Sequence, residues 1–308
     1  MSTLYFMVGL PASGKSTWAE ANKEKLNAVV HSSDAIREEL GDINDQSKNE
    51  LVFNTLHKRI KEDLMNGKNV IYDATNLSRK RRINFISHEL KNIPCEKVCV
   101  LFATPYECCV KNNATRERKV PEHVLERMYK LFNIPCLQEG WNDIHIVWWD
   151  YNKDGLKIDY FNDLKKWRRI SQDSLYHTLS IGDHMLAAED YYAQMNIEHL
   201  PIVYDAIIMH DCGKQMCKKF EDSSGNPSTV AHYYGHENSS SYMSLFYLKE
   251  LDMYTDEEIL YASLLINLHM RPFAWNQSGK AKENDRRLFG DDIISTIELI
   301  HECDLAAH

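Results

Sequence analysis

The 308-residue chain lacks the features that mark membrane, fibrous and low-complexity proteins. Its longest apolar runs, such as residues 98–103, are far shorter than the about 20 residues that cross a bilayer. Glycine and proline are scarce, at 12 and 8 residues, which argues against a fibrous or repetitive chain. No charged and apolar leader precedes the first strand-like segment, which starts at Leu4. We therefore expect no membrane association and a cytoplasmic location, in the host cell if a phage encodes the chain.

No CxxC pair occurs among the eight cysteines, so the usual spacing of zinc sites and of redox motifs is absent. Cys108 and Cys109 are adjacent, and the other six cysteines are scattered along the chain. Such a set does not form the dense disulfide framework of a small secreted domain. We expect reduced thiols in an intracellular compartment.

Basic charge is scarce in the second half of the chain. Residues 1–150 contain 21 basic and 20 acidic residues, whereas residues 151–308 contain 15 and 25, which gives the whole chain a net charge of −9. A protein that coats duplex nucleic acid normally has a broad basic face, so that class is disfavoured. The length corresponds to about two domains, and the charge difference predicts that the two differ in chemistry.

Apolar segments alternate with helical patterns in residues 1–150, which predicts an α/β domain with a parallel sheet and helices on both faces. The expected strands cover residues 4–8, 27–31, 69–72, 97–102 and 145–149. The expected helices cover residues 13–25, 50–65, 79–90 and 120–131.

The strand signal then fades, and a connector is expected over residues 151–170 before an all-α domain over residues 171–308. Apolar residues at helical spacing occur at 174–195, 202–209, 239–251, 256–268 and 291–307. Two segments rich in Gly, Ser, Asn and Pro, 221–228 and 272–283, are expected to be loops.

The most specific motif is G-x-x-x-x-G-K-S, which lies between the first expected strand and the first expected helix. In such a P-loop, backbone N–H groups hold phosphate oxygens, Lys15 adds a positive charge and Ser16 ligates Mg²⁺. The motif predicts a nucleotide site that is formed by Gly9, Ala12, Ser13, Gly14, Lys15, Ser16 and Thr17.

Asp34 and Arg37 follow the second expected strand, at the edge of the sheet where open α/β folds bind their ligands. An aspartate there is able to accept the proton of an attacking hydroxyl, and an arginine is able to hold a phosphate of the acceptor. An N-cap for a helix over residues 35–40 is an equally good interpretation of Asp34. One residue can serve both purposes.

Two further segments offer polar or basic side chains. The third expected strand is followed by Asp73, Thr75 and the basic run 79–82, which is also consistent with a solvated helix face. Arg116 and Arg118 lie on an expected loop before the helix at residue 120. Arginines there are able to close over the γ-phosphate and to stabilise charge during transfer.

The strings GLPASGKST, SSDAIR, DATN and R-x-R-K-V-P-x-x-V-L-x-R-M-Y resemble the polynucleotide 5′-hydroxyl kinases of phage and bacterial RNA-repair systems. The resemblance covers nearly all of residues 1–150. It implies ATP as the donor, Mg²⁺ as the ion at Ser16, Asp34 as the general base, and Lys15 and Arg116 as catalytic cations. On the acceptor side it implies contacts from Arg37, Asp73 and Thr75.

One departure concerns the lid over the donor. Members of that family often have a second lid arginine four positions before the first, and this chain has Asn112 there. Either Arg118 or Lys111 compensates, or the affinity for the donor is weaker. Arg118 is accordingly included among the expected nucleotide-binding residues.

The second half holds nine of the fourteen histidines. An adjacent histidine and aspartate, His210 and Asp211, are able to ligate one divalent metal ion through imidazole and carboxylate. The predicted ligands are His184, His210, Asp211 and Asp304 for one ion, with His236 and His269 for a second. Taken singly, each histidine is as readily a hydrogen-bonded core or surface residue.

The strings HDCGK, YGHE, NLHMRP, NDRRLFG and ECD resemble the HD phosphohydrolase superfamily, in particular the HD domains associated with tRNA nucleotidyltransferases. The resemblance covers about residues 175–305. It implies hydrolysis of phosphoesters with one or two ions of Mn²⁺, Ni²⁺, Co²⁺, Fe²⁺ or Zn²⁺. Lys214 would then neutralise the phosphate of the substrate.

Together the two resemblances imply a bifunctional end-healing enzyme. It would phosphorylate 5′-OH ends of RNA or DNA and hydrolyse 2′,3′-cyclic phosphate or 3′-phosphate ends, before a separate ligase acts. A small-molecule kinase fused to an HD nucleotidase is the main alternative. A third interpretation is a nucleotide-gated RNA sensor with an inactive second half. The sequence does not indicate an oligomeric state.

Overall fold

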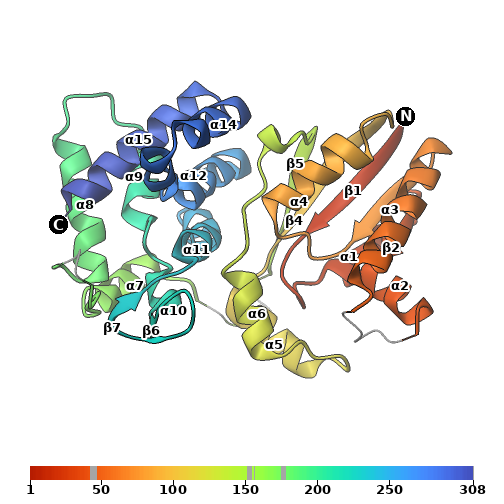
Figure 1. The fold of residues 1–308 in the computed structure, drawn as a ribbon, viewed down its shortest axis with the longest axis horizontal. Coiled ribbons are helices and arrows are strands. Elements are labelled where there is room, and N and C mark those ends of the chain that lie inside the picture. Colours follow the sequence, from red (N-terminus) through yellow and green to blue (C-terminus); the bar gives the residue numbers. More distant parts are fainter. Residues whose placement is uncertain (42–46, 151–154, 156, 175–177, 308) are drawn as a thin grey trace. The chain divides into compact units, whose positions relative to one another are not determined.

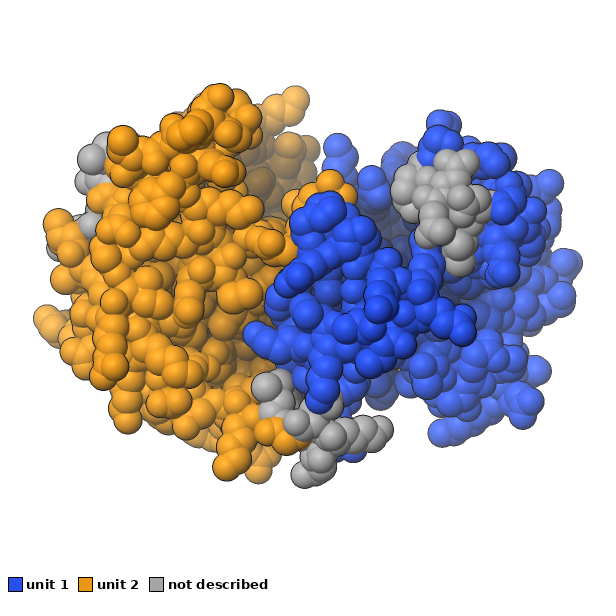
Figure 2. Space-filling model, turned by 90° about the horizontal axis from the view of Figure 1, so that it is seen from below, with its two compact units in different colours: residues 1–125, 135–150 blue, residues 126–134, 151–308 orange. Residues whose placement is uncertain are grey.

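The computed structural model describes residues 1–41, 47–150, 155, 157–174 and 178–307. The chain divides into two compact units (Figure 1; Figure 2). Unit 1 comprises Met1–Leu125 and Pro135–Asp150, and unit 2 comprises Glu126–Ile134 and Tyr151–His308. Among the described residues, no helix has the length and apolar character needed to cross a membrane. All eight cysteines are buried free thiols.

Unit 1 is built on a five-stranded sheet in the order β2-β3-β1-β4-β5 (Figure 1). Its strands are β1 (Ser2–Val8), β2 (Ala28–Ser32), β3 (Asn69–Asp73), β4 (Cys95–Ala103) and β5 (Asp143–Trp148). Every neighbouring pair is parallel. The parallel α/β fold that the first half of the sequence predicts is therefore confirmed.

Successive side chains of the central strand β1 pack on opposite faces of the sheet, as the period of a strand requires. Met7 belongs to an apolar cluster with Ala19, which lies on helix α1. Phe6 instead contacts the rings of Phe85 and Trp141 on the other face, with centroids 5.4 and 4.9 Å away. The core is thus two-sided, and the loops at the carboxyl ends of the strands remain available for a site.

The helices of unit 1 are α1 (Lys15–Asn22), α2 (Ser33–Glu39), α3 (Asn49–Met65), α4 (Arg79–Asn84), α5 (Tyr106–Thr115) and α6 (Glu122–Tyr129), of which α6 ends in unit 2. Helix α5 was not among the expected helices, and it contains Asn112. The N-cap interpretation of Asp34 is also wrong, because the side chain of Ser32 caps α2 by accepting a hydrogen bond from the backbone N–H of Asp34 at 3.2 Å.

Unit 2 is mainly helical. Its helices are α7 (Tyr160–Trp167), α8 (Ile181–Gln194), α9 (Pro201–Met209), α10 (Lys214–Cys217), α11 (His236–Glu250), α12 (Asp256–Leu268), α13 (Arg271–Gln277), α14 (Gly279–Phe289) and α15 (Asp291–Ala306). The expected helices at 202–209, 256–268 and 291–307 agree with α9, α12 and α15 to within two residues.

Three expectations for this half are wrong. The domain is not all-α, because β6 (Lys219–Glu221) and β7 (Pro227–His232) form an antiparallel hairpin around part of the expected loop. Residues 272–283 are helical in α13 and α14, and Pro272 lies at a helix start, where its missing N–H does no harm. The expected connector contains α7, which belongs to unit 2.

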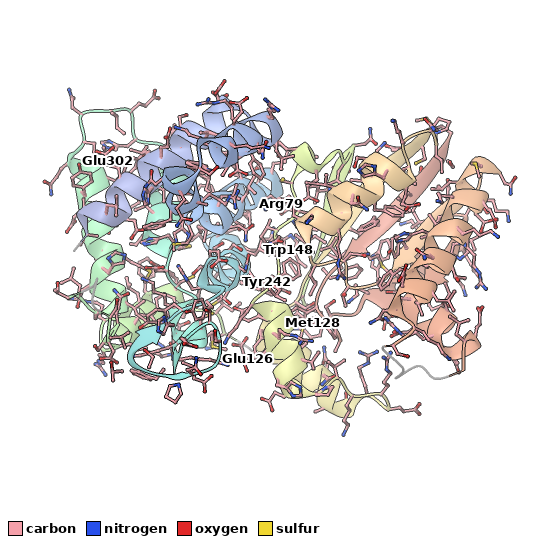
Figure 3. All side chains as sticks on the ribbon, in the orientation of Figure 1. Arg79, Glu126, Met128, Trp148, Tyr242 and Glu302 are labelled. Atoms are coloured by element: carbon pink, nitrogen blue, oxygen red, sulfur yellow. The ribbon has the colours of Figure 1, made fainter. Side chains whose placement is uncertain are left out.

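The expected boundary at residue 150 also requires a correction, because residues 126–134 belong to unit 2. Their physical anchor is aromatic. Tyr129 and Phe132 are buried, and their rings lie 5.6 and 4.7 Å from the ring of Tyr242 on α11. Figure 3 labels Tyr242. Aromatic pairs at such distances add stability beyond the apolar area that they bury.

Candidate active sites

The P-loop joins β1 to α1, in the context that the motif predicts. Ala12 and Gly14 have positive φ angles of 62° and 93°, which turn the chain into the N-terminus of α1. A Cβ atom on Gly9 would lie 2.8 Å from the Oγ of Ser13, so a larger residue there would displace the loop. Thr104 holds the loop from β4 by donating its hydroxyl to the carbonyl oxygen of Ser13 at 3.0 Å.

Lys15 folds back over its own loop. Its ammonium donates to the backbone carbonyl oxygens of Leu10 at 2.6 Å and Gly9 at 3.0 Å. Burial lowers the pKa of Lys15 to about 8, although the carboxylate of Asp73 opposes the change. Phosphate oxygens would be stronger acceptors for this ammonium than the two neutral carbonyls are.

Ser16 and Asp73 lie side by side at the carboxyl ends of the central strands. The hydroxyl of Ser16 donates to Oδ2 of Asp73 at 2.7 Å, and burial raises the pKa of that carboxyl group against this hydrogen bond. A P-loop hydroxyl beside a strand-end aspartate is the pair that holds Mg²⁺ in P-loop proteins. The backbone N–H of Gly9 donates to the carbonyl oxygen of Thr75 at 3.1 Å. Asp73 and Thr75 thus both contact the P-loop, a position that the sequence analysis did not foresee.

Asp34 forms ion pairs with two arginines. Its Oδ1 lies 3.1 Å from Nη1 of Arg37 and 2.8 Å from Nη1 of Arg118, and its side chain is 43% exposed. Arg37 is buried, donates to Oδ1 of Asn49 at 2.7 Å, and has no hydrogen-bond partner for its Nε. A solvent-accessible carboxylate between two guanidinium groups is suited to an acceptor that carries both a hydroxyl and an anionic group.

The lid segment begins where α5 ends. The carboxamide of Asn113 closes the loop by donating to the carbonyl oxygen of Val120 at 2.7 Å and accepting from its N–H at 2.9 Å. Asn112 donates to the carbonyl oxygen of Ala12 at 3.2 Å, so the residue that replaces a lid arginine supports the P-loop instead. Arg116 follows α5, and its positive charge contributes to the lowered pKa of Lys15.

The basic run 79–82 is not simply a solvated face. Arg82 is fully buried and forms a two-bond ion pair with Glu139, each bond 2.6 Å long. The same guanidinium donates to the carbonyl oxygens of Asn76 and Leu77, at 3.1 and 2.9 Å. Those carbonyls belong to the chain just after β3, so the pair stiffens the segment that presents Asp73.

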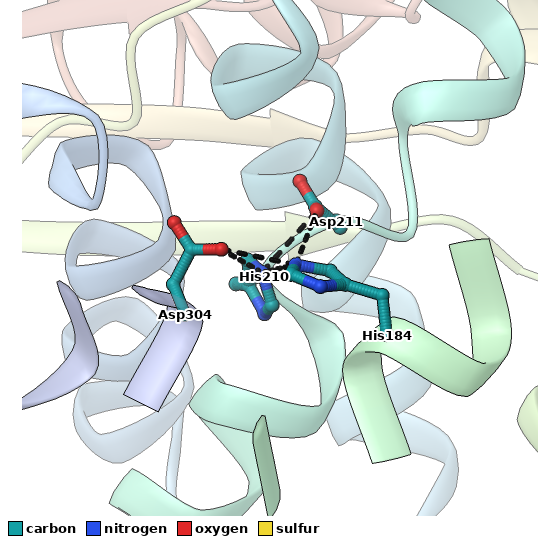
Figure 4. A group of neighbouring side chains, drawn as sticks. All are labelled: His184, His210, Asp211 and Asp304. Carbon is teal, nitrogen blue, oxygen red and sulfur yellow. Dashed lines mark hydrogen bonds and ion pairs between the residues drawn. The ribbon is translucent and has the colours of Figure 1, made fainter. Parts of the chain in front are cut away.

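In unit 2, the structure brings together the first predicted ligand set (Figure 4). Nε2 of His184 lies 2.9 Å from Oδ1 of Asp304 and 3.3 Å from Nε2 of His210. Oδ2 of Asp211 lies 3.3 Å from Nε2 of His184 and 3.2 Å from Nε2 of His210. Helices α8 and α15 and the two residues just after α9 thus supply four buried ligand atoms within 4.8 Å of one another.

The second predicted pair lies on the other side of Asp211. Nε2 of His236 and Nε2 of His269 are 3.2 Å apart. They lie 3.3 and 3.9 Å from Oδ1 of Asp211, whose other oxygen faces the first set. Asp211 is therefore placed to bridge two positions.

Backbone carbonyls orient all four histidines. Nδ1 of His184, His210, His236 and His269 lies 2.7–2.9 Å from the carbonyl oxygens of Ala307, Ile207, Tyr233 and Ile266, respectively. A ring whose Nδ1–H donates to a carbonyl presents the lone pair of Nε2, and this is the usual support of a metal-binding histidine. The Nε2 atoms all point at the Asp211 carboxylate.

These residues fit divalent ions. Two imidazole nitrogens about 2.0–2.1 Å from one ion in tetrahedral geometry lie about 3.3–3.4 Å apart, close to the two spacings in this cluster. Oδ1 of Asp211 is buried without a hydrogen bond, as a ligand atom would be. Oδ2 also has no hydrogen bond, but it forms an ion pair with the ammonium of Lys214 at 2.6 Å. The mixed imidazole and carboxylate donors favour Mn²⁺, Fe²⁺, Co²⁺, Ni²⁺ or Zn²⁺ over Mg²⁺.

The electrostatics of the cluster show how strongly its carboxylates attract positive charge. Burial lowers the pKa of His210, but Asp211 and Asp304 outweigh it and raise that pKa to about 10. Burial and the neighbouring histidines instead lower the pKa of His269 to about 3. The carboxylates therefore favour a positive charge at the first position, and a bound metal ion would supply that charge.

Two residues that no sequence motif marks, Gln172 and Tyr233, hold Lys214. The ammonium of Lys214 lies 2.6 Å from Oδ2 of Asp211 and donates to Oε1 of the buried Gln172 at 2.8 Å. Tyr233 donates its hydroxyl to the backbone carbonyl of Gln172, and its ring lies 5.5 Å from the ammonium. Gln172 lies in the expected helix-free stretch before α8, where no motif marks it.

Comparison with known proteins concerns mainly unit 1. Residues 4–135 match a family model described as "AAA domain". An L-seryl-tRNA(Sec) kinase of Methanococcus maripaludis is 28% identical over 175 residues, which cover 55% of this chain. The match spans 66% of that kinase, just under two thirds of its length.

Among solved structures, a kinase candidate from Chloroflexus aurantiacus matches 55% of this chain and 97% of its own, at 19% identity and a TM-score of 0.42. That likeness is too distant to support an argument about function. The family match and the curated relative agree with the P-loop geometry and with the parallel sheet. Unit 1 is therefore a P-loop α/β domain of the kinase-like kind.

Proposed function

We propose that the chain is a bifunctional enzyme that heals nucleic-acid ends. Unit 1 transfers the γ-phosphate of ATP to a 5′-hydroxyl of RNA or DNA, and unit 2 is an HD phosphohydrolase that acts on 2′,3′-cyclic phosphate or 3′-phosphate ends. The observation that carries the proposal is the presence, in one chain, of a P-loop with an arginine-flanked carboxylate and of a buried cluster of histidines and aspartates.

In unit 1 the chemistry needs a base, a held donor and a held acceptor. Lys15 leaves its two carbonyl acceptors for the β- and γ-phosphates of ATP, and Ser16 and Asp73 would hold Mg²⁺, which neutralises charge on the phosphates. Asp34 accepts the proton of the acceptor hydroxyl. The acceptor oxygen then bonds to the γ-phosphorus as the bond to the bridging oxygen breaks, and ADP leaves.

The arginines divide the remaining work. Arg37, whose Nε has no partner, binds a phosphate of the acceptor strand beside Asp34. Arg116 stabilises the negative charge on the group in transfer. Arg37 and Arg118 both contact Oδ1 of Asp34, so Oδ2 is the oxygen that takes the proton of the acceptor hydroxyl.

In unit 2, His184, His210, Asp211 and Asp304 would hold one metal ion, and His236 and His269 a second one bridged by Asp211. Such ions activate water and clamp a phosphate during hydrolysis. Water supplies the oxygen that bonds to phosphorus, and one ester bond of the cyclic or terminal phosphate breaks. Lys214 provides a positive charge at the same carboxylate.

The test uses RNA with defined ends and two variants that each remove one site. Lys15→Ala should abolish 5′-phosphorylation and leave 3′-end hydrolysis intact, and Asp211→Ala should do the reverse. Arg37→Ala should impair phosphorylation of an oligonucleotide or a 3′-phosphorylated mononucleotide more than that of a nucleoside. Equal losses on all three acceptors would favour a small-molecule kinase. A wild-type protein that is inert on every 3′ end after Mn²⁺ or Ni²⁺ loading would refute the role of unit 2.

A second acceptor is favoured by one specific observation, the similarity to an L-seryl-tRNA(Sec) kinase. In this case the hydroxyl would belong to an aminoacyl group on tRNA, and Asp34 would act on it in the same way. Incubation with ATP and either seryl-tRNA or a 5′-OH oligonucleotide separates the two acceptors. Label that mild alkali releases with the amino acid indicates the aminoacyl hydroxyl, whereas label that stays on the RNA indicates the 5′ end.

A further inference from the structure

The second histidine pair has a buried polar support on its own two helices. His236 begins α11 and His269 follows α12, and each has an asparagine two residues away on its helix. Nδ2 of Asn267 donates to Oδ1 of Asn238 at 2.8 Å and approaches Oγ of Ser241 at 3.3 Å. This amide pair links α11 to α12 two residues along the chain from each histidine.

A third asparagine comes from a distant part of the sequence. Nδ2 of Asn133 donates to the same Oδ1 of Asn238 at 2.9 Å, and Nδ2 of Asn238 donates to the carbonyl oxygen of Lys130 at 2.8 Å. A further donation from Asn238 to Oε1 of Glu237, at 3.1 Å, completes the capacity of its amide group. Asn238 and Asn267 are buried, so each of these bonds would leave an unsatisfied polar group if it were lost.

Residues 129–133 also contact the start of α11. Tyr129 donates its hydroxyl to the carbonyl oxygen of Ser239 at 3.3 Å. Gly235, at the N-cap of α11, has a φ angle of 82°, and a Cβ there would lie 2.6 Å from the carbonyl oxygen of Lys130. The contact is close enough that only glycine fits, so the segment determines where α11 and its first residue, His236, begin.

We propose that Asn133, Asn238 and Asn267 are positioning residues for the second metal position, and that residues 129–133 are therefore part of the hydrolase site. The inference rests on the proposed function of unit 2. Asn133 acts through Asn238, whose Oδ1 accepts from both Asn133 and Asn267, so that the spacing of His236 and His269 is maintained by three amides rather than by two.

The experiment measures metal binding in the full-length protein. Metal-depleted wild type is titrated with Co²⁺, followed by calorimetry and by the visible absorption of the bound ion, and two binding steps are expected. Asn133→Ala should weaken the second step about 10–100-fold, which is the usual effect of removing an outer support of a ligand, and should leave the first step unchanged. Asn133→Asp keeps the shape but lacks the amide donor, and it should weaken the second step at least as much.

Ser263→Ala is the matched control. Ser244 and Ser263 join the same two helices by a buried hydrogen bond of 3.0 Å, without an amide next to either histidine. This variant should change neither binding step by more than about two-fold. Kinase activity and the thermal midpoint, measured on the same samples, report whether each variant has folded.

The outcomes separate the inference from the function on which it rests. If the wild-type protein binds fewer than two Co²⁺ ions, the second metal position itself is refuted. Wild type that binds two ions, together with Asn133 variants whose second step equals that of Ser263→Ala, would overturn the positioning role and leave the proposed function standing. A parallel loss in both steps would show that residues 129–133 only stabilise the fold, which also overturns the inference.

Discussion

Replacing Glu139 by glutamine should strongly destabilise unit 1. Arg82 and Glu139 both have fully buried side chains, and their ion pair consists of two bonds of 2.6 Å. Glutamine has nearly the same shape but no charge, so the guanidinium would remain in the core with only two carbonyls and a neutral amide as partners. Breaking one side of a buried pair costs about 3–5 kcal/mol, because the remaining charge is not compensated.

Urea denaturation followed by tryptophan fluorescence measures this loss, since Nε1 of Trp141 donates to Glu139 at 3.1 Å. Glu126→Gln is the control, because Glu126 is partly exposed and pairs with Lys130 four residues on, at the end of α6, and i,i+4 pairs of this kind contribute about 0.3–0.5 kcal/mol. The double replacement Arg82→Met with Glu139→Leu should be less harmful than Glu139→Gln alone. If Glu139→Gln costs no more than Glu126→Gln, or if the double replacement is the worst of the three, our account of the pair is refuted.

Three further predictions concern the sites. The pKa of Lys15 is lowered to about 8, so its positive charge is present below that pH and is lost above it. The affinity of the free enzyme for ATP should therefore fall as the pH rises through 8. Lys15→Arg should remove this dependence, and equilibrium binding at several pH values measures both effects. Arg116→Ala should slow phosphoryl transfer by about 10³-fold or more in single-turnover assays, whereas a greater loss in Arg118→Ala would mean that Arg118 is the lid arginine. Asp211→Asn should lower the metal content measured by elemental analysis to at most one weakly bound ion per chain, and unchanged content would refute its bridging position.

The sequence predicted those parts of the sites that local spacing defines. The P-loop motif specifies both a turn and the start of a helix, so the positions of Lys15 and Ser16 followed from it directly. The histidine cluster was predicted as a set because an adjacent His210 and Asp211 require partners, and its other members lie on helices with clear apolar periodicity. The sequence predicts the helices themselves, but it does not show how they pack against one another, and this packing brings the ligands together.

The errors have a common cause, which is that they depend on contacts between distant residues. Asp34 is a residue type typical of an N-cap, but Ser32, two positions earlier at the end of β2, caps the helix instead. Arg82 belongs to a basic run that is typical of an exposed helix, and only the burial of Glu139, 57 residues away, makes it a core residue. Gln172 and Asn133 carry no motif, because their importance comes entirely from the groups that they contact.

The assignment of residues 126–134 to unit 2 has a consequence for how the protein can be divided. The polypeptide passes from one unit to the other three times, after residues 125, 134 and 150, so neither unit is a single uninterrupted stretch. A protease that cuts once near residue 150 would leave the aromatic anchor of the helical unit on the wrong fragment. For the same reason, an expression clone that starts after residue 150 would omit Tyr129 and Phe132, and a gene fusion made at that point could not transfer the helical unit intact.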